Sequence, residues 1–324
     1  VKAKFEAAWG AELSPTPGRA ITEMMAAAHH GEIKALYVVG ENPVLTEPDA
    51  RHAVEALKNT EFLVVQDVFL TETARLADVV LPGVTFAEKE GTFTNTDRRV
   101  QRVRPAIPPV GDSRPDWWIT CQIARRMGAA GFDFDGPEEI MEEIARLTPS
   151  YGGISYERIE KVGLQWPCPT PEHPGTPVLH TQQFTRGKGH LVPLEYKPSV
   201  ELPDDQYPLV LNTGRNLFHY HTGTMSRKVA GLNRFSSEER VEVNPAEAQA
   251  LGIAEGDLVR VTSRRGEVVA RARLTPASAK GAIFMTFHFA ESPTNQLTNP
   301  AADPVAKIPE YKVCAVRLEK KGRS

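Results

Sequence analysis

The first half of the chain alternates short apolar runs with segments in which apolar residues recur at helical spacing. Ala50, Val54 and Leu57 share one helix face, and further helices are expected at 116–128 and 138–147. Strands that alternate with helices predict a parallel sheet covered by helices on both faces. The runs typical of buried strands are residues 35–39, 62–66 and 77–81.

The last 120 or so residues show mainly the two-residue period of β-strands. One helix is marked by Asn244 as its N-cap, Pro245 at its first position and Gly252 at its end. Six strands with one short helix predict a small closed β-barrel, in which no strand edge is exposed. The six expected strands are residues 209–212, 241–243, 258–262, 267–274, 282–287 and 313–317.

Between these regions the periodicity disappears, and ten of the 26 prolines fall within residues 149–208. Tyr151, Tyr156, Trp166 and Phe184 favour an extended connector ordered by packing, since a flexible linker would be richer in Gly and Ser. The expected organisation is an α/β domain at 1–148, the connector at 149–206 and the barrel at 207–324.

Composition narrows the class of protein. With 324 residues, 41% hydrophobic and 24% charged, the chain is long enough for two packed domains. A net charge of −3 gives no reason to expect nucleic acid as a partner. Three scattered cysteines favour a reducing compartment, here the cytoplasm, and no apolar run is long enough to predict a membrane span.

The segment from Thr213 to Arg227 is the richest in chemistry. It follows a strand and gathers glycines, hydroxyls, His219, His221 and arginine, which are suitable donors for a phosphorylated ligand. On an extended chain the two histidines, two residues apart, would point the same way. The alternatives are a polar loop with one internally satisfied histidine, or a zinc site, which lacks a third ligand at suitable spacing.

Other segments are less specific. Residues 287–289, 295–298 and 309–312 offer aromatic, amide and lysine groups for a base or pterin ring, or simply for loop packing. Asp67 at a strand end is otherwise a turn residue, and Asp116 at a helix start is otherwise an N-cap. Lys89 precedes a basic stripe that is expected to be a solvated face, formed by Arg98, Arg99, Arg102 and Arg104.

An ordered series of seven segments resembles the C-terminal part of molybdopterin-dependent oxidoreductases, specifically the catalytic (alpha) subunit of formate dehydrogenase. The likeness extends over about residues 30 to 318, and the connector segments GISYER and QWPC indicate formate in particular. The segments are VGENP (39–43), residues 65–74 with 77–82, EKEGTFTN (88–95), GISYER (153–158), LQWPC (164–168), residues 213–227, and NQLT (295–298) with PEYK (309–312).

The resemblance implies a partial Rossmann-like α/β domain followed by a six-stranded double-psi β-barrel. It implies a molybdenum or tungsten ion bound through two molybdopterin guanine dinucleotides. One dinucleotide would be contacted from the sheet side by Asn42, Gln66, Asp67, Lys89 and Asp116. The barrel side would be lined by Thr213, Gly214, Arg215, Asn216, His219, His221, Thr222, Phe287, Asn295 and Lys312.

The family's metal ligand and the cysteines of its 4Fe-4S cluster belong to an earlier part of such subunits, and nothing here matches them. The chain is therefore expected to be a portion that is inactive alone, with no catalytic residue or metal ligand of its own. Its expected partners are formate, the remainder of the same subunit and an iron–sulfur electron-transfer subunit. The alternatives are another bis-molybdopterin enzyme, such as nitrate reductase, or a stand-alone pterin-binding module.

Overall fold

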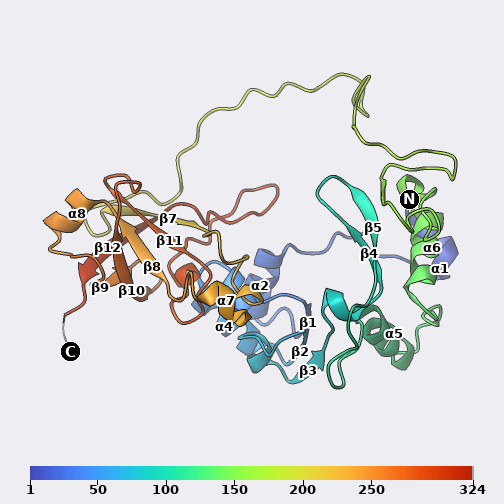
Figure 1. The fold of residues 1–324 in the computed structure, drawn as a ribbon, viewed down its shortest axis with the longest axis horizontal. Helices are drawn as coiled ribbons and strands as arrows, with labels where there is room; N and C mark the ends of the chain where they lie inside the picture. Colours follow the sequence, from blue (N-terminus) through green and yellow to red (C-terminus); the bar gives the residue numbers. More distant parts are fainter. Residues whose placement is uncertain (323–324) are drawn as a thin grey trace. The chain divides into compact units, whose positions relative to one another are not determined.

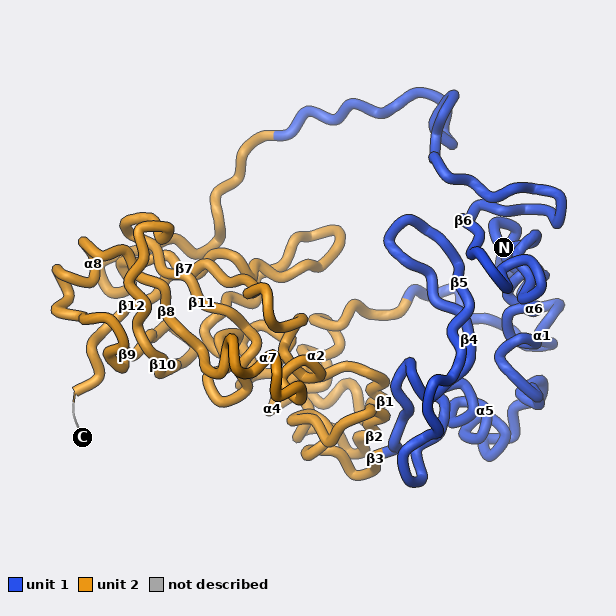
Figure 2. Tube along the Cα trace, viewed as in Figure 1, with its two compact units in different colours: residues 1–17, 81–194 blue, residues 18–80, 195–324 orange. Residues whose placement is uncertain are grey.

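The computed structural model describes residues 1–322, which group into two units that do not follow chain order (Figure 2). Unit 1 comprises Val1–Pro17 and Leu81–Leu194, and unit 2 comprises Gly18–Val80 and Glu195–Ser324. The barrel therefore shares a unit with the first strands of the α/β region. The domain boundaries expected at residues 148 and 206 stay a prediction.

Parallel strands form the α/β part of unit 2, in the order β1 (Ala35–Val39), β2 (Phe62–Asp67) and β3 (Val79–Pro82) (Figure 1). Alternate residues such as Leu63 and Val65 pack with helices α2 (Ile21–His29) and α4 (Ala50–Asn59). The short helix α3 (Pro43–Thr46) follows β1 directly.

The expectation of helices on both faces of this sheet is not met among the described residues of unit 2. The opposite face carries Tyr37, Val39 and Phe62, which are between 42% and 47% exposed. Their alternation with buried neighbours follows from the two-residue period of a strand.

A closed six-stranded barrel forms the rest of unit 2, in the order β10-β8-β11-β7-β12-β9. β7 runs parallel to β11 and β8 parallel to β10, while the other pairs are antiparallel. Inward-facing aliphatic side chains such as Leu211, Val261 and Ile283 form its core. The strands are β7 (Leu209–Gly214), β8 (Arg240–Val243), β9 (Leu258–Thr262), β10 (Glu267–Leu274), β11 (Ala282–Thr286) and β12 (Cys314–Lys320).

The closed barrel and its single clearly marked helix confirm the sequence prediction. Helix α8 (Pro245–Ala250) begins where expected, and the Asn244 side chain accepts a hydrogen bond from the Ala246 amide at 3.0 Å. Short helical turns lie in the loops of this unit: η1 (Ala74–Leu76), η4 (Ser226–Lys228), α7 (Ala230–Asn233) and η5 (Thr294–Gln296).

Unit 1 contains a small antiparallel sheet that the sequence did not predict. Its order is β4 (Gly91–Thr94), β5 (Arg99–Val103) and β6 (Leu164–Gln165). The expected helices are present as α5 (Asp116–Arg126) and α6 (Pro137–Leu147), together with α1 (Lys2–Trp9). The remaining turns are η2 (Phe86–Glu88) and η3 (Pro149–Tyr151).

Most of the basic stripe in and around β5 is not a solvated face, although Arg104 is 48% exposed as expected. Arg98 donates hydrogen bonds to the Trp166 and Thr176 carbonyl oxygens, and Arg99 donates to that of Gly163. Arg102, only 12% exposed, pairs with two glutamates and covers the Tyr156 ring at 3.8 Å. Because the connector supplies carbonyl and carboxylate acceptors, these arginines fasten it to the hairpin.

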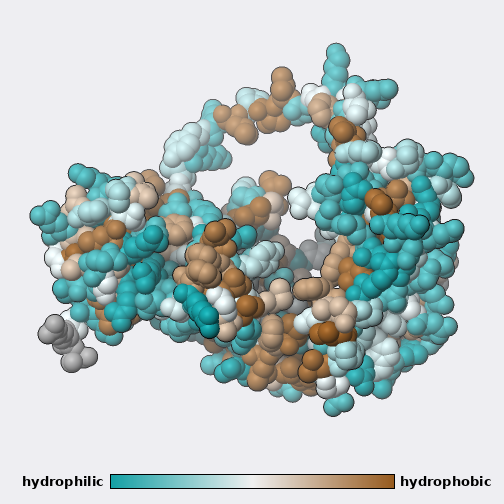
Figure 3. All heavy atoms as spheres, viewed as in Figure 1, coloured by the Kyte–Doolittle hydropathy of each residue, from teal (hydrophilic) through white to brown (hydrophobic). Residues whose placement is uncertain are grey.

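Only part of the connector is packed. Tyr156 and Cys168 belong to a buried cluster, and Trp166 stacks on Tyr151 with ring centroids 6.3 Å apart. Phe184, expected to pack, is 50% exposed, and Leu191 is 94% exposed. Apolar residues stand out along this stretch in Figure 3. Among residues 1–322, no helix has the length and apolar character needed to cross a membrane.

Candidate functional site at the mouth of the barrel

The parallel pairing of β7 and β11 brings the two chemistry-bearing segments of the barrel to one end. In the register of this pair, Thr213 lies beside Met285 and Gly214 beside Thr286. Both strands end there, so Arg215 and Phe287 emerge next to each other. Lys312 lies just before β12, which pairs with the other side of β7.

We call the group formed by Arg215, His221, Phe287 and Lys312 the barrel mouth. The Arg215 guanidinium carbon lies 5.8 Å from the Phe287 ring centroid, and the Lys312 ammonium nitrogen lies 5.9 Å from it. The His221 ring meets the same phenyl ring edge-on at 5.8 Å. Within residues 1–322 neither cation has a carboxylate partner, although the Lys312 ammonium donates to the Thr213 carbonyl oxygen at 2.6 Å.

This arrangement can bind a flat, anionic ligand. The half-buried Phe287 ring offers an aromatic surface, while two cations beside it are free to pair with phosphate oxygens. A cation already neutralised by a neighbouring carboxylate would contribute much less, because its charge would be compensated within the protein.

The two histidines of the loop have different surroundings and do not act as a pair. His219 is 4% exposed, and its ring nitrogens lie 3.3 Å from the Ser226 hydroxyl and 2.7 Å from the Ser236 carbonyl oxygen. It is the internally satisfied histidine foreseen as an alternative. His221 has a left-handed backbone with φ 48°, so the extended geometry that would align the two side chains is wrong.

A third histidine, His288, supports the loop from behind. Its Nε2 accepts a hydrogen bond from the Asn216 amide at 2.9 Å, and its Nδ1 contacts the His221 carbonyl oxygen. An acceptor at Nε2 and a donor at Nδ1 describe a neutral ring, and burial lowers the pKa of His288 accordingly. The sequence analysis included this residue in a segment but not among the site residues.

Several predicted barrel residues build the loop. The Asn216 side-chain oxygen accepts from the Phe218 and His219 amides, and the NH₂ of the same side chain donates to the Ser236 hydroxyl. The Thr213 hydroxyl donates to the Tyr311 carbonyl oxygen at 2.7 Å. Two others are buried: Thr222, whose hydroxyl lies 3.1 Å from that of Thr224, and Gly214, where a Cβ would lie 2.5 Å from the Phe284 ring.

Asn295 and Tyr311 hold helix α3 against the barrel within unit 2. The Asn295 NH₂ donates to the Leu45 carbonyl oxygen at 2.8 Å, and the Tyr311 hydroxyl donates to that of Thr46 at 2.9 Å. Carbonyls at the end of a helix lack partners within it, so these bonds satisfy them. Among the residues that the structure describes, the buried Asn295 side-chain oxygen has no hydrogen-bond partner, so it is an acceptor available to a bound N–H group.

Glu47, directly after α3, is also buried. Burial raises the pKa of its carboxyl to about 7, and the nearby Glu41 charge adds to the shift. Burial and the Glu47 charge together raise the pKa of Tyr311. Tyr311, which the sequence analysis missed, therefore remains a hydrogen-bond donor at neutral pH.

The sheet-side residues of unit 2 lie at the carboxyl ends of β1 and β2, where ligands bind in open α/β sheets. The Asn42 side chain is buried and bonded to Thr73 and Glu72. The Gln66 side chain is fully buried and accepts from the Tyr37 hydroxyl, and the Asp67 carboxylate accepts from the Phe69 amide at 3.1 Å.

Lys89 and Asp116 lie in unit 1 and form an ion pair of 2.7 Å. Asp116 is the first residue of α5, and the N-cap is Pro115, so the N-cap alternative for Asp116 is wrong. The structure thus joins these two residues to each other and gathers the other predicted residues in unit 2. Their assignment as cofactor contacts stays a prediction.

Two family models match parts of the chain. Residues 209–315 match the model described as Molydopterin dinucleotide binding domain, and residues 3–126 match the model described as Molybdopterin oxidoreductase. The chain belongs to the molybdopterin oxidoreductase family.

The chain is also similar to individual proteins that are named formate dehydrogenases. The chain is 49% identical over 319 residues to the F420-dependent formate dehydrogenase subunit alpha of Methanocaldococcus jannaschii, covering 98% of this chain and 47% of the relative. It is 36% identical over 323 residues to formate dehydrogenase H of Escherichia coli, covering 98% and 45%. The chain thus spans about half the length of the curated relatives it matches.

A solved structure shares the fold. Acetylene hydratase from Pelobacter acetylenicus aligns with a TM-score of 0.69 over 93% of this chain and 46% of that one. The sequences are 18% identical, so this likeness concerns the fold alone.

Proposed function

We propose that this chain is the cofactor-binding part of the catalytic subunit of a formate dehydrogenase. The complete enzyme would oxidise formate to carbon dioxide at a molybdenum or tungsten bis(molybdopterin guanine dinucleotide) centre. The observation that carries the proposal is the barrel mouth, where two cations without carboxylate partners in residues 1–322 flank the Phe287 ring. Formate as substrate is supported by relatives named formate dehydrogenase at 36% to 51% identity.

The residues present fit such a cofactor. Arg215 and Lys312 suit the pyrophosphate, Phe287 suits a flat pterin ring, and the buried oxygen of Asn295 suits a ring N–H. The cofactor, when bound, supplies the two-electron redox chemistry, and the protein supplies binding and orientation. Asp67 and Asp116 remain the proposed acceptors for guanine N–H groups.

The test uses the complete subunit loaded with cofactor. Arg215→Ala and Lys312→Ala should each lower the bound pterin, measured by fluorescence after oxidative release, by about tenfold, since each removes one charge-assisted contact. Arg317→Ala is the matched control, because Arg317 is a barrel cation that pairs with Glu319. Unchanged pterin content in both site variants would contradict the assigned roles.

The electron acceptor belongs to the same proposal. Electrons would leave through a 4Fe-4S cluster and an iron–sulfur subunit, and the F420-dependent relatives suggest F420 as the final acceptor. A cytoplasmic location is proposed from the three free, buried cysteines. The purified complex should reduce F420 with formate; reduction of nitrate instead would indicate the alternative oxidoreductase.

A further inference from the structure

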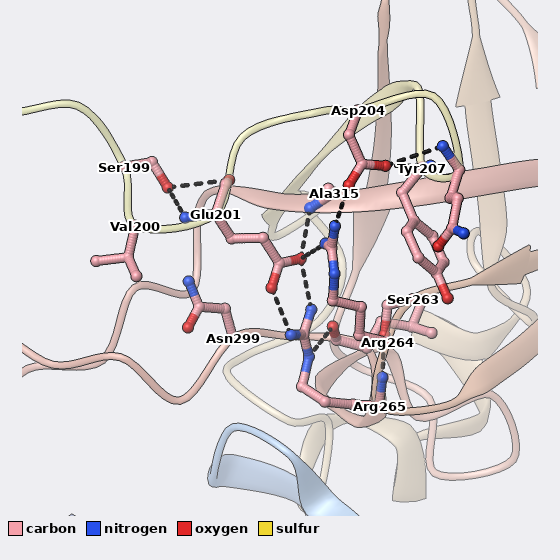
Figure 4. A network of polar contacts seen from close by, with 12 residues as sticks. Ser199, Val200, Glu201, Asp204, Tyr207, Ser263, Arg264, Arg265, Asn299 and Ala315 are labelled. Carbon is pink, nitrogen blue, oxygen red and sulfur yellow. Dashed lines mark hydrogen bonds and ion pairs between the residues drawn. The ribbon is translucent and has the colours of Figure 1, made fainter.

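The carboxylate of Glu201 is the centre of a polar network that joins the end of the connector to the barrel (Figure 4). It meets the Arg265 guanidinium in a two-pronged ion pair, with N–O distances of 2.6 and 2.8 Å. Both side chains are only 12% exposed. The Ala315 amide donates a third hydrogen bond to the same carboxylate at 2.8 Å. Such bidentate pairs fix direction as well as distance.

Glu201 also lies 3.4 Å from Arg264, but its other two partners, Arg265 and Ala315, lead to segments with predicted cofactor groups. The Arg265 Nε donates to the Leu297 carbonyl oxygen at 2.9 Å, and Leu297 directly follows η5, which contains Asn295. Ala315 lies in β12, three residues after Lys312. One buried carboxylate thus links the segments that carry Asn295 and Lys312.

A second bridge runs parallel to the first. The Glu310 carboxylate accepts hydrogen bonds from the Asn299 NH₂ at 2.9 Å and from the Val200 amide at 3.3 Å. The backbone just before Glu201 therefore contacts Glu310, and Glu310 in turn joins the two segments by its bond with Asn299. These contacts reinforce the spacing set by the ion pair.

We propose that Glu201 is a positioning residue for the cofactor, which sets the separation of Asn295 and Lys312 through Arg265 and Ala315. This inference rests on the proposed function. Glu201 would not touch the cofactor itself. It would act through Arg265 and Ala315 on Asn295 and Lys312, which are the groups that would contact the cofactor. Supporting contacts of this kind typically change affinity or activity by about 10- to 100-fold when removed.

The competing explanation is that the ion pair only fastens the connector to the barrel. The two explanations differ in a measurable way. If the ion pair only attaches the connector, its removal lowers the thermal stability and leaves the rate of cofactor release from the folded protein unchanged. A positioning residue changes the release rate even where the protein remains fully folded.

The experiment measures pterin dissociation from the complete, loaded subunit. Glu201→Gln, which breaks the ion pair, and Arg265→Lys, which keeps the charge but loses the two-pronged geometry, should both speed release about tenfold. Asp204→Asn is the matched control. It removes the more exposed ion pair between Asp204 and Arg264, keeps the 3.4 Å ion pair of Arg264 with Glu201, and should leave release unchanged.

A double variant keeps the test decisive if the single variants fold poorly. Replacing a buried ion pair by apolar residues of similar size is often neutral for stability, so Glu201→Leu with Arg265→Met should keep the wild-type Tm. We expect this folded variant to release pterin about tenfold faster. Wild-type release from it, or faster release from Asp204→Asn as well, overturns the positioning role. Wild-type subunit that holds no pterin would instead overturn the proposed function.

Discussion

The arginines of strand β5 and the cations of the barrel mouth look alike in the sequence, but their partners differ completely. Arg98 and Arg102 have carbonyl or carboxylate partners from the connector. Arg215 and Lys312 have no carboxylate partner within residues 1–322, and both flank an aromatic ring. Positively charged residues in a sequence therefore indicate a site for an anionic ligand only if the fold leaves them without carboxylate partners.

The barrel also contains a buried acid, Glu239, that forms no ion pair among the described residues. Glu239 is 3% exposed and accepts hydrogen bonds from the Thr286 amide and hydroxyl. It lines, with Arg215 and Asn216, a cavity of about 510 Å³. Burial raises the pKa of Glu239 to about 7, although the Thr286 and Arg240 donors oppose the shift.

The largest expected effect is therefore on pH dependence. Between pH 4.5 and 7 the folded state holds a proton on Glu239 that the unfolded state has lost, so the free energy of unfolding falls as pH rises. The loss should reach about 3 kcal/mol and then level off. Glu239→Gln mimics the protonated acid and should reduce the slope, leaving the part that Glu47 contributes over the same pH range, measured by urea unfolding of the complete subunit. An unchanged slope would show that Glu239 is charged in the fold.

The next largest effect is expected for an arginine of the β4–β5 hairpin. Arg102→Met removes two ion pairs and the contact with the Tyr156 ring, and should cost about 2 kcal/mol, less than a fully buried pair because Glu90 and Glu160 are half exposed. This loss of stability is measured as faster amide hydrogen exchange in β4 and β5. Exchange in the barrel strands is the internal control and should not change.

A smaller effect is expected where the barrel mouth depends on neutral hydrogen bonds. Tyr311→Phe leaves the Thr46 carbonyl without its donor and should cost about 1 kcal/mol. Because no charges are involved, the loss should be the same at low and high salt, unlike the Arg102 effect. Salt-dependent destabilisation in urea would indicate a different origin.

The smallest effect is the most diagnostic. Arg215→Met removes a cation with no carboxylate partner in residues 1–322, so the free energy of unfolding should change by less than about 0.5 kcal/mol. The same substitution should still lower bound pterin. A loss of stability as large as that of Arg102→Met would mean that Arg215 is structural and that the contrast between the two regions is wrong.

The barrel was predictable because strands such as β8, β9 and β10 keep a two-residue period and because Asn244 and Pro245 mark its helix. The β4–β5 hairpin was not, since arginines occupy positions where an apolar alternation would identify a strand. In the hairpin's turn, which begins at Asn95, the left-handed position is occupied by Arg98, with φ 65°, and not by the glycine or asparagine that is usual there.

The site was only partly accessible to sequence reasoning. Segments carrying Arg215, Phe287 and Lys312 could be singled out by composition, and the register of β7 and β11 explains why they meet. Tyr311 was missed because its partner, the Thr46 carbonyl oxygen, is 265 residues away. The different surroundings of His219 and His221 depend on one left-handed backbone angle, which no spacing rule predicts.

The hydrogen bond from Asn295 to the Leu45 carbonyl joins residues 250 positions apart. During synthesis the early α/β segment leaves the ribosome long before the strands that complete its unit. Until then its α3 carbonyl oxygens lack their donors from Asn295 and Tyr311. Synthesis of the C-terminal strands then finishes a structure begun near the other end. A stop before Tyr311 would consequently remove strand β12 from the barrel and also the donor that satisfies the Thr46 carbonyl oxygen of the early segment.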